Sequence, residues 1–430
     1  MSNPQDYTIG WICAVTVEAV AARAMLDEEH DAPEAIGRND NNSYFLGRIG
    51  RHNVVIAALP DKEYGLTSAA SVARDMVRSF HNVRIGLMVG IGGGVPSSKH
   101  DIRLGDVVVS DRSNGMGGVF QYDYGKAIQD SANPRFETTG HLNQPPQVLL
   151  TAVAQMKAEH MLKGHSLNEG AEKALQAIYE SESFCRPPSE EDRLFKSSFI
   201  HAKNTEGCKD VCDSSFLVPR KDRVKEKGRL AIHYGLIASA NTLMKNATIR
   251  DKLAEQHDIL CFEMEAAGLM NHFPCLVIRG ICDYSDSHKN HHWQGFAALM
   301  AAAYAKELLS FVHSSKVEEE KRLGEVLAGI TKIKKNVRRL VSQQQKSEFD
   351  SVLQWLTPHE FWPQHNDFSA RRQEGTGQWL LKTEEFEVWR ETKGRILLCQ
   401  GIPGAGKTIL ASSVIDSLQT RGKTSRRLYV

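Results

Sequence analysis

The segment 261–268 most constrains the fold, because an apolar strand there passes directly into a helix, with Glu263 and Glu265 at the junction. A second apolar run, 275–278, is soon followed by Asp283. Open α/β sheets bind their ligands beyond the carboxyl ends of the strands. We therefore expect Glu265 and Asp283 to lie on one rim, where two carboxylates can serve an acid-assisted cleavage. The alternative is that Glu265 only places a favourable negative charge at a helix N-terminus.

The N-terminal segment repeats this arrangement. Residues 7–15 are apolar and rich in strand-forming types, which predicts a buried strand, and Thr16 can cap a helix over 18–26. Glu18 then falls in a first helical turn at the carboxyl end of a strand, which is the rim expected for the two later acids. Compensation of the helix dipole by a first-turn acid is again the alternative.

Further apolar segments continue the alternation of strands and helices through residue 313. We expect strands at 44–50, 53–59, 84–89, 104–110 and 233–239, and helices at 65–80, from 241 onward and at 294–312. The strand at 84–89 runs into glycines, Gly92 and Gly93 among them, whose backbone can approach a ligand closely. This run does not match the dinucleotide-binding fingerprint. The pattern predicts an α/β domain over 1–313.

Charge and composition narrow the choice of partners. The 53 Lys and Arg nearly balance the 52 Asp and Glu, so no net field favours nucleic acid or a membrane surface. No apolar run approaches the roughly 20 residues of a membrane span, and the first residues lack the features of a secretion signal. We expect a cytoplasmic protein that binds neither nucleic acid nor membrane.

The 8 cysteines are spread along the chain, and several lie inside apolar strands, as reduced buried thiols do. The spacing Cys208-x-x-x-Cys212, with His201 and Cys185 upstream, is the arrangement to weigh for a metal. Zinc sites favour tighter, paired spacings, so we interpret these cysteines as structural and expect no metal. They belong to the polar, proline-interrupted segment 130–228, which we interpret as an insertion that supplies a lid or an interface.

Five motifs in order resemble those of the purine and uridine phosphorylase superfamily. They occupy residues 9–18, 89–94, 103–108, 262–266 and 279–283. Within that superfamily the pattern is most similar to methylthioadenosine/S-adenosylhomocysteine nucleosidases. The resemblance covers about 7–312 apart from the insertion. It implies a twisted mixed sheet with flanking helices, in the α/β class, and cleavage of the N-glycosidic bond of nucleosides.

The resemblance also implies a role for individual positions. Glu18 matches the residue that activates the attacking water, Glu265 the one that holds the ribose hydroxyls, and Asp283 the acid that protonates the purine. The other substrate-binding positions are Met264 beneath the sugar, Trp293 closing over the substrate, Leu243 and Met244 beside the base, and Phe262, Glu263, Gly92 and Gly93 around them. To donate a proton near neutral pH, Asp283 must be buried or have a carboxylate neighbour. Asp286 is a candidate for that neighbour, and a solvated loop acid is the favoured alternative for it.

The choice between water and phosphate as the attacking group depends on two positions. Phosphorylases of this superfamily carry Gly-Asp-Pro after the first strand, with an arginine shortly beyond, and a second arginine just before the glycine run. Here the first position reads Val15-Thr16-Val17-Glu18 and the second holds Met88. Because phosphate binds best to charge-assisted donors, the sequence favours hydrolysis over phosphorolysis.

Beyond the first domain, apolar residues at three-to-four spacing over 314–347 predict a helical linker. The final region, 348–430, begins with interleaved aromatics and arginines, which favour a small packed helical unit over nucleic-acid binding. A strand expected at 395–400 then leads into a complete Walker A motif and a helix. The motif residues are Gly401, Gly404, Gly406, Lys407 and Thr408.

In such a motif the loop amides and Lys407 contact phosphates and Thr408 holds Mg²⁺. ATP with Mg²⁺ is therefore the candidate cofactor of this region, and none is expected for the first domain. The preceding segment, 371–380, resembles the opening of fungal NACHT-type signalling NTPases, in which a nucleoside phosphorylase-like domain often precedes as the effector. No Walker B acid follows before Val430, so we expect an incomplete P-loop domain without ATPase activity.

Together these features predict a hydrolase that releases the base from a purine nucleoside or nucleotide, ATP included. By resemblance it would be the effector of a fungal NLR-like protein in immunity or heterokaryon incompatibility, and a homo-oligomer. Two alternatives stay open: a phosphorolytic enzyme, and a catalytically silent nucleoside-binding sensor. For a nucleotide, the candidate phosphate-binding cations are Arg48, Lys62, Arg112 and Lys126.

Overall fold

The computed structural model describes residues 1–129, 135–201, 207–223, 230–289, 291–325, 361–392 and 395–420. The chain divides into two compact units, Met1–Lys332 and Ile333–Val430, and each is described by itself. The predicted linker lies largely outside the described residues, so the predicted domain boundaries stay predictions.

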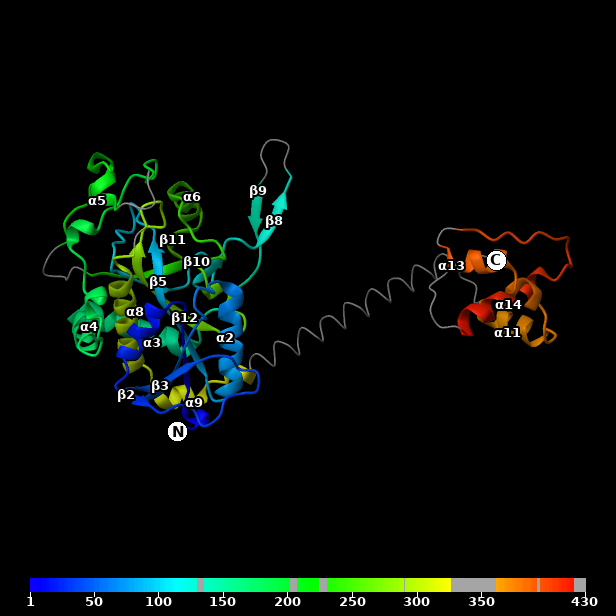
Figure 1. The fold of residues 1–430 in the computed structure, drawn as a ribbon, viewed down its shortest axis with the longest axis horizontal. Coiled ribbons are helices and arrows are strands. Elements are labelled where there is room, and N and C mark those ends of the chain that lie inside the picture. The colour runs from blue at the N-terminus through cyan, green and yellow to red at the C-terminus, as the bar shows by residue number, and fades with distance from the viewer. Residues whose placement is uncertain are drawn as a thin grey trace. The chain divides into compact units, whose positions relative to one another are not determined.

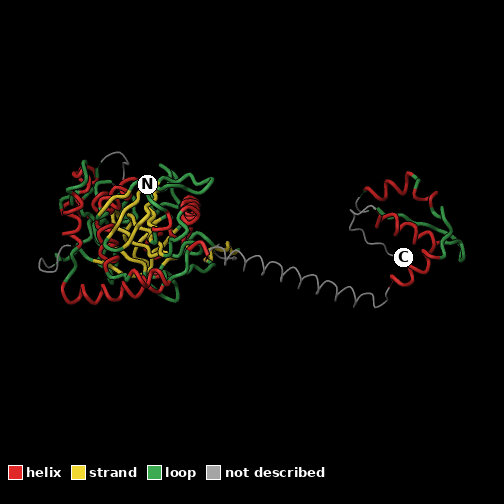
Figure 2. The backbone as a smooth tube through the Cα atoms, turned by 90° about the horizontal axis from the view of Figure 1, so that it is seen from below, coloured by secondary structure: helices red, strands yellow, loops and turns green. Residues whose placement is uncertain are grey.

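A ten-stranded mixed sheet forms the centre of the first unit, with helices around it (Figure 1, Figure 2). Its strands are β1 Ile9–Cys13, β2 Glu28–His30, β3 Tyr44–Ile49, β4 His52–Ala58, β5 Ile85–Gly94, β6 Val107–Ser110, β7 Val119–Gln121, β10 Ile232–Ser239, β11 Ile259–Glu263 and β12 Cys275–Asp283. Their order is β11-β10-β6-β12-β5-β1-β4-β3-β2, with β7 beside β10. A separate hairpin of β8 Gly125–Ile128 and β9 Arg135–Thr138 projects from the body (Figure 1).

The sheet brings several strand ends to one place. Strand β11 pairs with both β10 and β5, so five strands close into a ring. Gly93 of β5 lies opposite Phe262 of β11 and opposite Asp283 of β12. Because β1, β5 and β12 run parallel, their carboxyl ends share an edge. This edge is where the first helix begins with Glu18 in its first turn.

Helices cover the sheet. They are α1 Thr16–Ala24, α2 Leu66–Ser79, α3 Gln147–Lys163, α4 Leu167–Leu175, α5 Cys208–Val211, α6 Ala247–His257, α7 Ala266–Leu269, α8 Gln294–Ser310 and α9 Ser314–Glu319. The alanine-rich α8 packs along β12 and β5 and is almost wholly buried. Among the described helices none is alone both long and apolar enough to cross a membrane, and α8 passes that test only with the next helical segment, as a pair bent by 88°.

Two elements near the strand ends differ from prediction. The helix expected from residue 241 starts at Ala247, because the Asn246 side chain accepts hydrogen bonds from two amides of the first turn and so caps the helix there. The strand expected at 84–89 continues to Gly94, because its glycines pair with both β11 and β12. The loop before α6 and the extended glycine strand both line the site described below.

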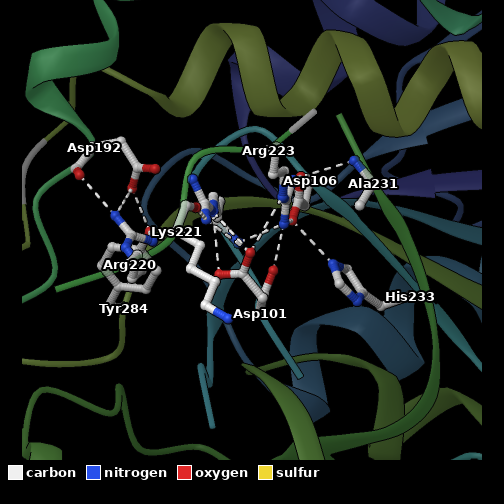
Figure 3. A network of polar contacts seen from close by, with 10 residues as sticks. Asp101, Asp106, Asp192, Arg220, Lys221, Arg223, Ala231, His233 and Tyr284 are labelled. Atoms are coloured by element: carbon white, nitrogen blue, oxygen red, sulfur yellow. Dashed lines mark hydrogen bonds and ion pairs between the residues drawn. The ribbon is translucent and has the colours of Figure 1, made fainter. Parts of the chain in front are cut away.

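The insertion is anchored to the sheet by an ion pair and a hydrogen bond (Figure 3). Arg223 donates to both oxygens of Asp106, each at 2.6 Å, which is the strong bidentate geometry. Burial acts to raise the pKa of Asp106, but Arg223 and His233 outweigh it and lower the pKa. Arg220 donates to the hydroxyl of Tyr284 at 2.7 Å. Since Tyr284 directly follows β12, the insertion contacts the end of that strand.

The second unit is helical in its described residues. Its helices are α11 Phe361–Ala370, α12 Gln378–Leu381, α13 Glu384–Glu391 and α14 Lys407–Thr420, and Leu380, Phe386 and Val414 form its core. The strand predicted at 395–400 is wrong: these residues are described and form no strand, and Ile396 is 91% exposed. A strand needs neighbours to pair with, and the described part of this unit offers none.

Candidate active site

A pocket of about 450 Å³ opens where the strand ends meet. Its walls come from the ends of β1, β5, β11 and β12 and from the loops after β4 and β10. Of the residues predicted for this site, it is lined by Glu18, Gly92, Gly93, Leu243, Met244, Phe262, Glu263, Met264, Glu265 and Asp283. Three acids that are distant in sequence, Glu18, Glu265 and Asp283, therefore open into a single cavity.

The Glu18 carboxylate is held by the backbone around it. Its Oε2 accepts from the amides of Ala14 at 2.5 Å and Val15 at 3.2 Å, and its Oε1 accepts from Ile91 at 2.8 Å. Burial raises the pKa of Glu18, while a nearby cation and these amides oppose the rise. A fixed carboxylate with a raised pKa at a cavity wall can accept a proton from a bound water.

Arg279 is the cation that contacts the glutamates of the pocket, and it is 0% exposed. Its guanidinium donates to Glu263 and lies 3.4 Å from Glu265 Oε2 and 3.8 Å from Glu18 Oε1. Burial acts to lower the pKa of Arg279, but the three glutamates outweigh it and raise the pKa. We did not assign Arg279 a role from the sequence, although an arginine inside an otherwise apolar strand is a signal, because a buried charge requires partners.

Glu263 and Glu265 differ in how closely their carboxylates are hydrogen-bonded. Glu263 accepts from the amides of Glu265 and Ala266 as well as from Arg279, so it mainly fixes the turn. Glu265 has longer contacts, 3.3 Å from the amides of Gly65 and Met264. Burial has the largest effect on Glu265 and raises its pKa. The charge of Arg279 opposes this rise and the neighbouring glutamates add to it, so that the pKa is raised to about 7.

Asp283 has a neighbour that we did not predict. Lys289 Nζ lies 2.8 Å from its Oδ2, and the Ser285 amide donates to Oδ1 at 2.8 Å. Asp286, the candidate neighbour named from the sequence, instead lies 4.0 Å from Arg250. The charge beside Asp283 is therefore a cation and not a carboxylate.

The apolar wall contains Leu243, Met244, Phe262 and Met264, and Leu243 is substantially exposed. Trp293 does not belong to it. Its ring is fully buried and meets Phe296 edge to face at 6.0 Å, so the expectation that Trp293 closes over the substrate is wrong. It precedes α8 directly, and packing of that helix on the sheet draws the ring inward.

Only one of the four candidate phosphate-binding cations lines the pocket, and it is Lys62. Arg48 instead pairs with Glu28 at 2.8 Å, Arg112 lines another hollow, and Lys126 lies on the exposed hairpin strand β8. Two non-glycine residues at the pocket, Lys62 and Ser285, have positive φ, of 62° and 54°. Such conformations cost energy and tend to collect at functional sites.

In the glycine-rich loop of the second unit, the Lys407 side chain hydrogen-bonds to the loop backbone. Lys407 Nζ donates to the carbonyls of Gly401 at 2.8 Å and Ile402 at 2.9 Å. Gly404 and Gly406 have positive φ, of 85° and 77°, which a glycine adopts without strain. Thr408 follows Lys407 in the first turn of α14. The loop thus surrounds an ammonium group at a helix N-terminus, which suits a phosphate.

The chain is similar to a curated protein and matches a family model. A curated nucleotide-binding leucine-rich repeat (NLR)-like protein of Hyaloscypha variabilis is 47% identical over 310 residues, which are 72% of this chain. The chain is similar to an NLR-like protein. It spans only 30% of the length of that relative. The family model described as nephrocystin 3, N-terminal, matches residues 375–430.

Solved structures similar to this chain include two nucleosidases and a futalosine hydrolase. Methylthioadenosine/S-adenosylhomocysteine nucleosidase of Helicobacter pylori is 14% identical with a TM-score of 0.43, over 71% of this chain and 98% of its own. Futalosine hydrolase of the same organism is 15% identical with a TM-score of 0.42, over 71% and 98%. The Colwellia psychrerythraea nucleosidase is 17% identical with a TM-score of 0.43, over 72% and 98%.

Proposed function

We propose that the first unit hydrolyses the N-glycosidic bond of a purine nucleoside or nucleotide. The observation that carries this proposal is that Glu18, Glu265 and Asp283 line one pocket. The apolar wall of Met244, Phe262 and Met264 suits a flat base and the underside of a sugar.

The three acids divide the chemistry. Asp283, in its acid form, gives its proton to the purine as the carbon–nitrogen bond breaks and the bonding electron pair leaves with the base. The sugar carbon becomes cation-like, and Glu265 holds the ribose hydroxyls beside it, which stabilises that state. Water bonds to the carbon, and Glu18 takes the proton that the water loses. Free base and free sugar are the products.

Water fits the sugar end of the pocket better than phosphate. Glu18, Glu263 and Glu265 surround that end with carboxylates, and the one buried arginine there, Arg279, is already paired with them. An incoming phosphate would meet like charges and find no uncommitted guanidinium among the described residues of the wall. Phosphorolysis is therefore disfavoured.

A more specific form of the proposal is that the substrate is a nucleotide. Lys62, Lys289 and His291 line the pocket, and Lys62 lies in a turn after β4, on a different wall from Asp283. A 5′-phosphate is an anion that a lysine can bind as a point charge. Similarity to an NLR-like protein supports the proposal that the first unit is the effector domain of such a protein. We also propose that the protein is cytoplasmic and homo-oligomeric.

A second candidate function has a specific observation in its favour. The ion pair of Lys289 with Asp283 stabilises the carboxylate that the reaction needs in its acid form. A module that binds a nucleoside and signals without cleaving it would tolerate that ion pair. The enzyme requires Lys289 to release Asp283 when the substrate binds.

We also propose that the loop from Gly401 to Thr408 binds ATP with Mg²⁺. Lys407 would exchange the loop carbonyls for phosphate oxygens, and Thr408 would hold the ion, which would neutralise phosphate charge. The described part of the second unit contains no acidic residue on a neighbouring strand to complete a Mg²⁺ site, so this proposal concerns binding.

The test is release of base by the purified full chain from adenosine, inosine, methylthioadenosine, AMP and ATP, separated by chromatography with and without added phosphate. We expect free base without phosphate dependence, a loss of about 10²–10⁴-fold in Asp283→Asn and Glu18→Gln, and no change in Lys407→Ala. Products that appear only with phosphate would favour the phosphorylase. Tight nucleoside binding without any product, equal in wild type and Asp283→Asn, would favour the silent module.

A further inference from the structure

A second cluster of reactive side chains lies in the insertion, away from the pocket lining. His201 Nδ1 lies 3.0 Å from Cys212 Sγ and 3.8 Å from Cys208 Sγ, and one ligand atom from each of the three lies within 4.8 Å of the others. In a tetrahedral zinc site, neighbouring sulfur and nitrogen ligands lie about 3.5–3.8 Å apart, given their bond lengths to the metal. The three groups are therefore close enough together to share one metal ion.

A fourth group adjoins this cluster. His288 is 7% exposed, and neither ring nitrogen has a hydrogen-bond partner among the described residues. Its ring stacks on Phe195 at 4.2 Å and meets the His201 ring edge to face at 5.6 Å. The Asp286 carboxylate Oδ2 lies 3.7 Å from His288 Nδ1. A buried imidazole without partners is costly unless something binds it.

The chemistry of this set selects the ligand. Two thiols and two imidazoles are soft and borderline donors, which favour zinc over magnesium or calcium, since those ions prefer oxygen. We propose that His201, Cys208 and Cys212, with His288 as the fourth ligand, bind a structural zinc ion. The two thiols would lose their protons to solvent as the metal binds. The sequence spacing alone led to the opposite expectation, because it could not show that His288, 76 residues beyond Cys212, returns to the cluster.

A zinc ion bound by this cluster would affect the loop that follows β12, because two contacts join the cluster to that loop. The His201 amide donates to Ser287 Oγ at 3.0 Å, and the Cys208 thiol donates to the His288 carbonyl at 3.7 Å. Both contacts join the insertion to the loop that follows β12. Lys289, which pairs with Asp283, is the next residue along that loop. A zinc ion bound by His201 and His288 would fix this loop against the insertion.

The test measures metal in the purified full chain after dialysis, by mass spectrometry, together with affinity by competition with a chromogenic chelator. We expect about one zinc per chain in wild type and in the matched control Cys185→Ser, whose exposed thiol lies outside the cluster. Cys208→Ser and Cys212→Ser should lose the metal, and His288→Ala, which removes the fourth ligand, should bind it more weakly than wild type.

A measurement on the wild type covers the case in which the cysteine variants do not fold. Replacement of zinc by Co²⁺ should give thiolate-to-cobalt absorption and the intense visible bands of a tetrahedral ion, with the signal displaced by added zinc. Absence of these bands, or zinc retention equal to that of the Cys208→Ser/Cys212→Ser double variant, would overturn the proposal. So would a Cys208–Cys212 disulfide in the isolated protein with no metal bound after reduction.

Discussion

The Lys289 ammonium group lies 2.8 Å from Asp283 Oδ2, and both side chains line the same pocket. Burial acts to lower the pKa of Lys289, but the adjacent carboxylate outweighs burial and raises the pKa. The lysine is therefore firmly charged, and it is paired with the acid of the proposed reaction. Any proton donation by Asp283 depends on how this contact changes when a purine enters.

Lys289→Met should raise kcat for base release, because it removes the ammonium group that pairs with the Asp283 carboxylate in the pocket. The measurement is kcat and KM for wild type and variant at the same pH. Lys316→Met, which removes an exposed lysine paired with Glu319, is the control. An unchanged kcat in Lys289→Met would show that this ion pair does not limit proton donation by Asp283.

Glu265 predicts a pH dependence of ligand binding. Its pKa is raised from 4.5 to about 7, first by burial, so it is largely neutral at pH 6 and ionised at pH 8. An ionised carboxylate accepts ribose hydroxyls more strongly, and affinity for a non-hydrolysable nucleoside analogue should rise with pH through about 7. Calorimetric titration measures this dependence, and Glu265→Gln should bind about tenfold more weakly with a flat profile. Equal slopes in both proteins would assign the titration to another group.

The raised pKa of Glu265 also makes the free energy of unfolding depend on pH. Because the folded value lies above the ordinary one, Glu265 contributes stability that is fully present below about 4.5 and is lost as the pH rises through about 7. Binding and stability should therefore respond to pH in opposite directions at this residue, with binding favoured by the ionised form and folding by the neutral one. Urea unfolding of wild type and Glu265→Gln at several pH values checks this, and the variant should lack the decline.

The sequence predicted the strand ends better than the side-chain partners. The positions of Glu18, Glu265 and Asp283 at strand ends follow from local apolar patterns, which strand and helix periods make visible. The partner of Asp283 does not follow, because Lys289 reaches back through a loop whose path depends on tertiary contacts. Trp293 shows the same limit, since whether an aromatic faces a pocket or the core depends on how α8 packs. The strand at 395–400 failed because pairing partners cannot be inferred from one apolar run.

Arg279→Met should destabilise the first unit by about 3–5 kcal/mol at pH 8, because it leaves three buried glutamates without their cation. The loss should shrink towards pH 6, where Glu265, whose pKa is about 7, becomes protonated. Urea denaturation measures both values. Arg48→Met, which removes an exposed ion pair with Glu28, should cost no more than about 1 kcal/mol. A pH-independent loss in Arg279→Met would show that packing, and not charge, is what the arginine provides.

Gly90→Ala tests whether the placement of Glu18 matters to the reaction. A Cβ on Gly90 would lie 2.2 Å from Glu18 Oε1, which is inside contact distance, so the carboxylate must leave its amide donors. Base release should fall by about 10²–10⁴-fold, the contribution of a positioned general base, with nucleoside affinity changed far less. Gly170→Ala in α4, where the nearest atom would be 3.9 Å away, should keep full activity and gain up to about 1 kcal/mol of stability. Full activity in a folded Gly90→Ala protein would remove Glu18 from the mechanism, because the three atoms nearest to that methyl group all belong to the Glu18 carboxylate.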